Sequence, residues 1–345
     1  MTYQELATYS NYALYSAMAV LTLSMLAYAG YLAGLMPARS ESKEARRAEQ
    51  VRAREEALVG VGGDGDSGGA DGGAAGTATA AGVPDAGTGR PIDEGVSLTA
   101  RKLGGIAGSF AWLATFLLLV SIGLRGLSVM RAPLGNMFEF AVVACTFVML
   151  VFSLWSTQRD LRWLGIFVVT PVLLVLGIAI RSWYTEAAEL MPSLQSYWLV
   201  IHVAVAVLAM AVSFIGAVTG VLYLAKDKAE RADQPSILDR FPTSRVLERL
   251  TYGLHVIAFP LWTFTLIAGA IWARQAWASY WNWDPKEVWT FVIWVVYAAY
   301  LHARVTSGWS KQRATYIALA GFVCILINYG VVNLFFVSQH SYSGL

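Results

Sequence analysis

The chain has 345 residues, of which 57% are hydrophobic and only 14% are charged. This composition excludes an ordinary water-soluble domain with a single core and predicts a membrane protein. The formal net charge of +2 gives no sign of a nucleic-acid partner, because the basic residues are accounted for by their positions in loops between apolar segments.

Eight apolar segments without Lys, Arg, Asp or Glu follow one another along the chain. A helix of about 20 apolar residues crosses a hydrocarbon core of ~30 Å, and none of the segments alternates as a membrane β-strand does. The sequence therefore predicts an all-α polytopic membrane protein with about eight transmembrane helices. The predicted spans are residues 12–36, 103–124, 140–156, 163–180, 197–225, 250–273, 288–303 and 314–337.

The loops between these spans differ strongly in charge. Cytoplasmic loops retain Lys and Arg, and most basic residues lie in the loops after the first, third, fifth and seventh spans. Both termini and the loop after the sixth span are therefore predicted to be extracytoplasmic, in a multi-pass protein of the cytoplasmic membrane. The basic residues predicted on the outer face are Arg125, Arg131, Arg181, Arg274 and Lys286.

Composition also divides the chain into three parts. Residues 1–36 are predicted to form an N-terminal transmembrane helix, and residues 103–345 a seven-helix domain. Between them, residues 37–102 are predicted to form a cytoplasmic linker that is first charged and then Gly-rich, with too few large apolar residues to fold. Cys145 and Cys324 lie within spans and form no CxxC pair, which argues against thiol redox chemistry.

The stretch WASYWNWDPKEVW, residues 277–289, lies between the sixth and seventh spans. Its DPKE part has the order of a helix start, with Asp284 as N-cap, Pro285 first and Glu287 third. Tryptophans anchor proteins at membrane interfaces, but this loop holds more than anchoring requires. If the stretch were a short interfacial helix, one face would form an apolar shelf for a large flat ligand. That face would carry Trp277, Tyr280 and Trp281.

Two of the four histidines are predicted at the depth of this loop. His202 lies near the outer end of the fifth span, and His340 just beyond the eighth. One such histidine is readily explained by a hydrogen bond to a neighbouring helix. Two of them beside an aromatic shelf favour axial ligation of a haem iron, and the outer basic residues would suit the haem carboxylates.

Further motifs accompany the tryptophans: APLGNMFE at 132–139, YAAYLHAR at 297–304 and HSY at 340–342. Together with the pattern WxxYWxWDPKExW, these motifs show that the region of about residues 103–343 resembles the CcsA/ResC family. Members of that family are the membrane haem subunit of System II cytochrome c biogenesis. Two positions depart from the family pattern. Ala278 stands where the family usually has glycine, and Phe138 where it usually has tyrosine.

The resemblance implies that His202 and His340 are axial ligands of one outward-facing haem b, bound transiently as substrate. It implies a further haem site inside the membrane at His302. It also implies that the tryptophan-rich loop, residues 275–288 with the start of the next helix, cradles the porphyrin. The residues expected to bind the cofactor there are Trp277, Tyr280, Trp281, Trp283, Asp284 and Trp289.

The family presents and is expected to export haem for thioether attachment to the CxxCH cysteines of apocytochrome c. The implied partners are the ResB/CcsB subunit, apocytochrome c and thiol-reducing maturation proteins. The sequence offers no nucleophile or general base, so the chain is expected to serve a cytochrome c synthase complex mainly by orienting its substrates.

Two other functions are compatible with parts of this pattern. Paired histidines at two depths also describe a two-haem b-type, quinone-linked electron-transfer subunit, although a permanently bound haem needs no open aromatic shelf. A helical transporter would suit a span broken at Pro260. The inner haem is expected to bind His302 and a partner histidine, with a His255–His302 pair as the alternative.

Overall fold

The structure is a computed structural model that describes residues 2–35, 51–52, 97–187, 196–232 and 236–339. Eight helices in this part of the chain are long and apolar enough to cross a membrane, which confirms the predicted all-α fold and each predicted span. They are α1 (Tyr3–Gly34), α3 (Leu98–Ser128), α4 (Met137–Gln158), α5 (Gly165–Ser182), α6 (Tyr197–Ala232), α7 (Ser244–Trp277), α8 (Pro285–Val305) and α9 (Lys311–Leu326). A π-helix η3 (Ile327–Val332) and a short α10 (Asn333–Phe335) continue α9, and a 3₁₀ turn η2 (Ile237–Arg240) precedes α7.

Local sequence explains where several helices begin. Asp284 caps α8 with Pro285 in the first turn, and Glu287 completes a capping box, as the DPKE order predicts. Thr2 and Glu5 form the same box at the start of α1. α6 ends beyond its apolar core in charged residues, and α7 begins with charged residues before its apolar core.

Pro260 does not interrupt its helix. α7 is continuous from Ser244 to Trp277 with Pro260 inside it. The break at Pro260 that would have suited a transporter is therefore absent from this helix.

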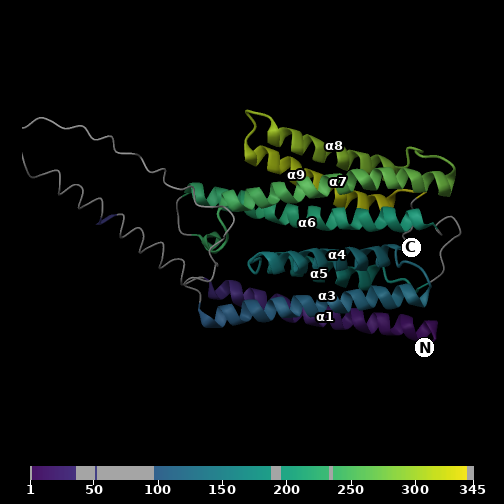
Figure 1. The fold of residues 1–345 in the computed structure, drawn as a ribbon, viewed down its shortest axis with the longest axis horizontal. Coiled ribbons are helices and arrows are strands. Elements are labelled where there is room, and N and C mark those ends of the chain that lie inside the picture. Colours follow the sequence, from purple (N-terminus) through teal and green to yellow (C-terminus); the bar gives the residue numbers. More distant parts are fainter. Residues whose placement is uncertain (1, 36–50, 53–96, 188–195, 233–235, 340–345) are drawn as a thin grey trace, which may run out of the picture.

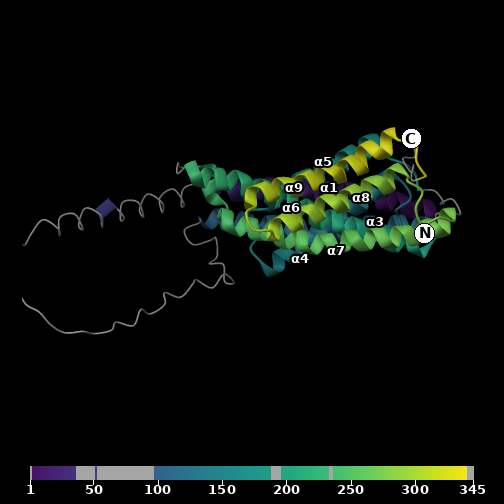
Figure 2. The same ribbon diagram turned by 90° about the horizontal axis from the view of Figure 1, so that it is seen from above.

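The helices form two neighbouring groups (Figure 1). α1 packs along α3 beside α4 and α5, while α6, α7, α8 and α9 form the second group, and α4 and α6 join the two. The view turned by 90° shows that the helices remain roughly aligned along one direction (Figure 2). The start of α1 and the end of α10 lie at one end of the bundle, as an even number of spans requires.

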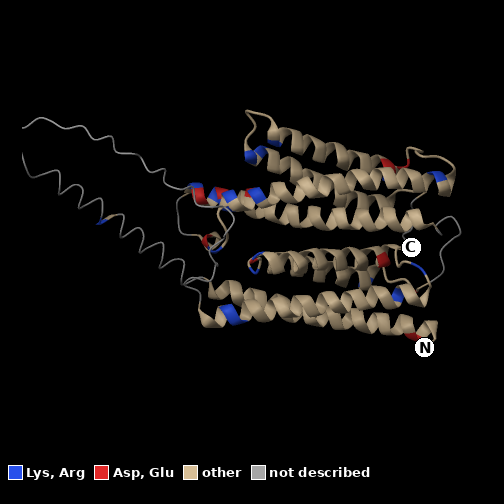
Figure 3. Cartoon of the chain, viewed as in Figure 1, with Lys and Arg blue, Asp and Glu red and all other residues tan. Residues whose placement is uncertain are grey.

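Charged side chains gather at the two ends of this bundle and leave its middle apolar (Figure 3). α1 belongs to the same core as the later helices, because Tyr28 packs on Gly165 and Tyr31 on Gly104. Small residues of this kind let helices approach closely in lipid. The predicted linker, residues 37–102, lies outside the described residues except at 51–52 and 97–102.

A buried ion cluster holds the turn between α3 and α4. The Glu139 carboxylate accepts from Arg125 Nε at 3.0 Å, from Arg131 Nη1 at 2.8 Å and from the Gly135 backbone N–H at 2.8 Å. Glu139 and Arg125 are almost fully buried. The cluster fixes the backbone that enters α4, whose first turn contributes to the pocket described below.

We expect Glu139→Ala to destabilise the protein markedly, because it leaves two largely buried guanidinium groups without their carboxylate. Breaking a buried ion pair in this way typically costs about 3–5 kcal/mol. Thermal unfolding in detergent measures the effect. Asp160→Ala is the control: its ion pair with Arg162 is partly exposed, with side chains 23% and 30% accessible, and such pairs contribute ~0.2–1 kcal/mol. Equal shifts in the two variants would contradict the role assigned to the cluster.

Candidate functional site

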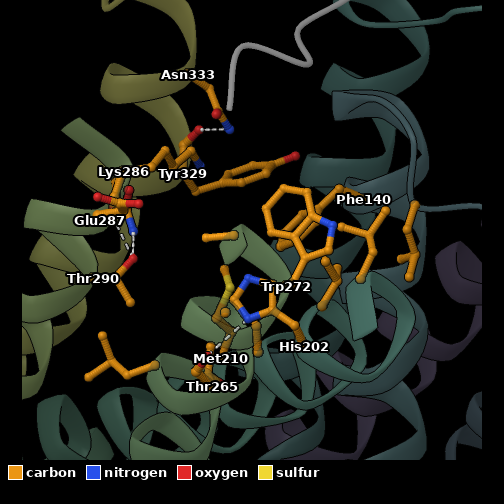
Figure 4. Close-up of a pocket in the computed structure, with 18 of the residues that line it drawn as sticks. Phe140, His202, Met210, Thr265, Trp272, Lys286, Glu287, Thr290, Tyr329 and Asn333 are labelled. Atoms are coloured by element: carbon orange, nitrogen blue, oxygen red, sulfur yellow. Dashed lines mark hydrogen bonds between the residues drawn. The ribbon is translucent and has the colours of Figure 1, made fainter. Parts of the chain in front are cut away.

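A pocket opens at the end of the bundle where α4 begins and α7 ends (Figure 4). Its walls come from the start of α4, from α6, α7 and α8, from the loop between α7 and α8, and from η3. The empty volume is about 1280 Å³ when the space at its open mouth is included. The pocket is open at its mouth, and apolar and aromatic side chains make up most of its lining, as is usual for small-molecule sites.

His202 of α6 forms one wall of this pocket. Its Nδ1 lies 3.0 Å from the Thr265 carbonyl oxygen of α7, and its ring stacks on Trp272 with centroids 6.1 Å apart and planes 10° from parallel. The ring sits on Gly269, where a Cβ would come within 2.7 Å of Cε1. Because a carbonyl only accepts, the neutral ring carries its proton on Nδ1 and its lone pair on Nε2. A ring fixed in this tautomer is suited to metal ligation through Nε2.

The tryptophan-rich loop is not the short helix on which the predicted shelf depended. α7 ends at Trp277 because Ala278 takes a left-handed conformation with φ 59°, and residues 278–284 form a loop. Tyr280 and Trp281 line the pocket, whereas Trp277 packs on Trp272 with ring centroids 4.7 Å apart. The prediction that Trp277 shares a face with Tyr280 and Trp281 is therefore wrong. The left-handed conformation also explains why a glycine suits position 278.

The remaining tryptophans of the motif, Trp283 and Trp289, are not among the lining residues. Trp283 also has a positive φ, 58°, and is 75% exposed, with its ring against that of Trp281 at 5.8 Å. Trp289 is half-buried in the second turn of α8 and is not among the lining residues. Sequence alone did not separate these positions, because the loop backbone decides which rings turn inward.

Asp284 lies beside the pocket and is not one of its lining residues. Its Oδ2 accepts from the Lys286 backbone N–H at 3.2 Å, and its Oδ1 accepts from the Gln339 backbone N–H at 2.8 Å. The Asn282 amide also donates to Gln339 Oε1 at 3.3 Å. The loop thus holds the segment that follows α10. His340, the next residue, lies outside the described residues.

A polar wall faces His202 and Trp272 across the pocket (Figure 4). It is formed by side chains of the first turns of α8 and of η3, and Asn328 donates to Thr290 Oγ1 at 3.2 Å. Sequence reasoning took Glu287 only as a capping residue and missed Asn328. The available signal was an amide within an otherwise apolar span. The wall consists of Lys286, Glu287, Thr290, Asn328 and Tyr329.

His255 and His302 are not brought together. His255 is buried, and its ring lies on Gly216 between Tyr297 and Tyr300, with both ring centroids at 5.2 Å. His302 is exposed in the last turn of α8. α8 therefore presents its tyrosines to His255 and leaves His302 on another face of the helix.

Among the Lys and Arg residues that the structure describes, Lys286 alone lines the pocket. Arg125 and Arg131 belong to the ion cluster with Glu139. The Arg274 guanidinium donates to the Ala278 carbonyl at 3.0 Å. Lys286 is therefore the basic side chain placed to meet an anionic group of a ligand here.

Fold and pocket define a polytopic helical membrane protein with an aromatic, histidine-bearing ligand pocket at one end of its helices. Residues 132–340 match the model of the cytochrome C assembly protein family, and the chain belongs to this family. The matched region contains every pocket-lining residue.

Curated relatives agree with this assignment. The chain is 34% identical over 254 residues to the cytochrome c biogenesis protein CcsA of Guillardia theta, covering 68% of this chain and 84% of the relative. It is 32% identical over 277 residues to CcsA of Parasynechococcus marenigrum, with 72% and 88% covered. The CcsA of Chlamydomonas reinhardtii is 37% identical over 216 residues, with 61% and 60% covered.

We expect Gly269→Ala to lower cytochrome c maturation strongly, because the added methyl group displaces the His202 ring from its position. A misplacement of about 1 Å at a functional group can cost roughly 10²-fold in rate. The yield of mature c-type cytochrome in cells that depend on this chain measures the effect. Gly253→Ala, in the same helix with nothing within 4 Å of the added Cβ, is the matched control. Equal yields from the two variants would contradict the role given to Gly269.

Proposed function

We propose that the chain binds haem b in the pocket beside His202 and presents it for covalent attachment to apocytochrome c. Membership of the cytochrome c assembly family sets this within cytochrome c biogenesis. The observation that carries the proposal is the fixed His202 imidazole at the wall of an open pocket lined largely by apolar and aromatic side chains. Haem is a flat apolar macrocycle with two carboxylates, and its iron accepts imidazole as an axial ligand.

The second axial ligand in this proposal is His340. The support comes from its neighbour Gln339, which Asp284 and Asn282 hold against the loop that borders the pocket. Lys286 is the proposed partner of a haem propionate, since it is the basic side chain that lines the pocket. Tyr280, Trp281 and Trp272 provide aromatic walls, while Trp277, Trp283 and Trp289 support or border them.

The proposal places the pocket on the extracytoplasmic face of the cytoplasmic membrane. Its support is the excess of Lys and Arg in the loops at the opposite end, which include the start of α7 and the α8–α9 loop. Residues 1–36 then form the first membrane helix, 37–102 a cytoplasmic linker, and 103–345 the haem-handling domain. The proposed partners are a ResB/CcsB subunit, apocytochrome c and thiol-reducing maturation proteins.

We expect His202→Gly and His340→Gly each to abolish cytochrome c maturation, and added imidazole to restore it in part. Imidazole is small enough to enter the space left by the side chain and to supply the missing nitrogen to the iron. The absorption spectrum of the co-purified haem should change in each variant and move back toward wild type when imidazole is added.

Unchanged haem spectra in both variants would overturn the ligand assignment. Spectra also separate this proposal from an electron-transfer subunit. That alternative requires near-stoichiometric haem that is reduced and reoxidised by a quinol and quinone pair, independently of any apocytochrome.

We further propose an inner haem site at His302, with its second ligand supplied by the partner subunit. Its exposure in the last turn of α8 leaves His302 accessible to a partner, whereas His255 is enclosed by Tyr297 and Tyr300. His302→Ala is expected to lower the haem content of the complex, and His255→Ala to leave it nearly unchanged if folding is preserved. Equal losses in both variants would favour an internal pair, and no loss in either would remove this site.

A further inference from the structure

The two oxygens of the Glu287 carboxylate have different surroundings. It is buried, with 8% of the residue exposed, in the first turn of α8. Its Oε2 accepts from the backbone N–H groups of Asn282 at 2.8 Å and Asp284 at 3.1 Å. Its Oε1 is buried and has no hydrogen-bond partner among the described residues. The first pair of contacts therefore fixes the carboxylate and leaves one oxygen for another donor.

Helix capping accounts for only half of this arrangement. A capping box needs one acceptor oxygen for the N-cap backbone, and Oε2 meets that need. Glu5 makes the same box at α1, but at an exposed position where water can satisfy the other oxygen. At Glu287 the second oxygen is buried at the lining of the pocket. A buried unpaired acceptor is costly and points to a donor that arrives with a ligand.

Glu287 lies across the pocket from His202 (Figure 4). Among the described lining residues it is the one carboxylate. The neighbouring elements contribute further titratable groups, while the lining residues of α4 and α7 contribute none. These groups are Tyr280 and Asp284 of the loop, Lys286 of α8, His202 of α6 and Tyr329 of η3.

We propose that Glu287 Oε1 accepts the proton of the client cysteine thiol and returns it to the vinyl group that the sulfur attacks. This inference rests on the proposed function, since it concerns the attachment of haem in the same pocket. A donor for Oε1 must be an N–H, O–H or S–H group. The vinyl groups of haem carry none, and its ionised propionates only accept, whereas the client cysteines bring S–H groups to the vinyl carbons.

The chemistry balances without an oxidant or reductant. The thiol S–H bond breaks, its proton passes to the Glu287 carboxylate, and the thiolate forms a C–S bond with one vinyl carbon. The proton then passes from Glu287 to the other vinyl carbon, which forms a C–H bond and restores the carboxylate. Thiols with a pKa of about 8.5 are mostly protonated at neutral pH, so a positioned base accelerates the attack.

The test compares Glu287→Gln with wild type in the purified complex, supplied with haem b and a peptide containing one Cys-x-x-Cys-His sequence. Glutamine can still cap the helix but cannot take up the proton. We expect haem binding, read from the absorption spectrum, to be unchanged. We expect single-turnover thioether formation at pH 7 to slow by about 10²-fold, the usual range for a lost general base. Glu5→Gln makes the same change in an exposed capping box and should behave as wild type.

Dependence on pH distinguishes a base from a structural residue. The ratio of wild-type to Glu287→Gln rates should shrink by roughly tenfold or more between pH 7 and pH 9, because the thiol then ionises unaided. Glu287→Asp, which keeps a carboxylate, should recover part of the rate at pH 7. Equal rates at pH 7, a ratio that does not change with pH, or loss of haem from Glu287→Gln would overturn the inference. Failure of the proposed function has a different signature: His202→Gly would then leave the haem spectrum unchanged.

Discussion

The close contact between α6 and α7 is the constraint on which the pocket depends. The two helices run antiparallel, and each seats a histidine ring on a glycine of the other: His202 on Gly269, and His255 on Gly216. A Cβ at either glycine would come within 2.7 or 2.6 Å of the ring. Association of helices in lipid depends on such close packing, so the paired contacts fix both separation and register. That register brings the Thr265 carbonyl to Nδ1 of His202.

The end of the bundle that carries the pocket is organised around the last turn of α7. Ala278 ends the helix in a left-handed conformation, and the loop then lines the pocket with Tyr280 and Trp281 before the capped start of α8. One aspartate, Asp284, both caps α8 and holds Gln339. The aromatic wall, the polar wall and the C-terminal segment thus depend on one short stretch of backbone.

The eight spans were predictable because apolar segments of membrane length have only one regular structure open to them in lipid. The start of α8 was predictable because the capping box is a local motif. The conformation of the loop between α7 and α8 was not predictable, because it depends on positive φ angles at Ala278 and Trp283. Neither residue type indicates such an angle in the sequence. This is why Trp277 was placed in the shelf although its ring packs on Trp272.

The polar wall of the pocket could not be predicted from the sequence either. Capping explained Glu287 fully as long as the surroundings of its second oxygen were unknown. Asn328 turns toward Thr290 from a π-helix, where the extra residue per turn shifts which side chains face inward. The place of His202 near the start of its helix was predictable from the span, but its ring orientation comes from tertiary contacts with α7.

The most direct test of the account is a cryo-electron microscopy map of the protein purified with its bound haem. The account predicts porphyrin density in the pocket between His202 and the Glu287 wall, with the iron bonded to Nε2 of His202. Haem density elsewhere in the bundle, with this pocket empty and His202 unligated, would contradict it.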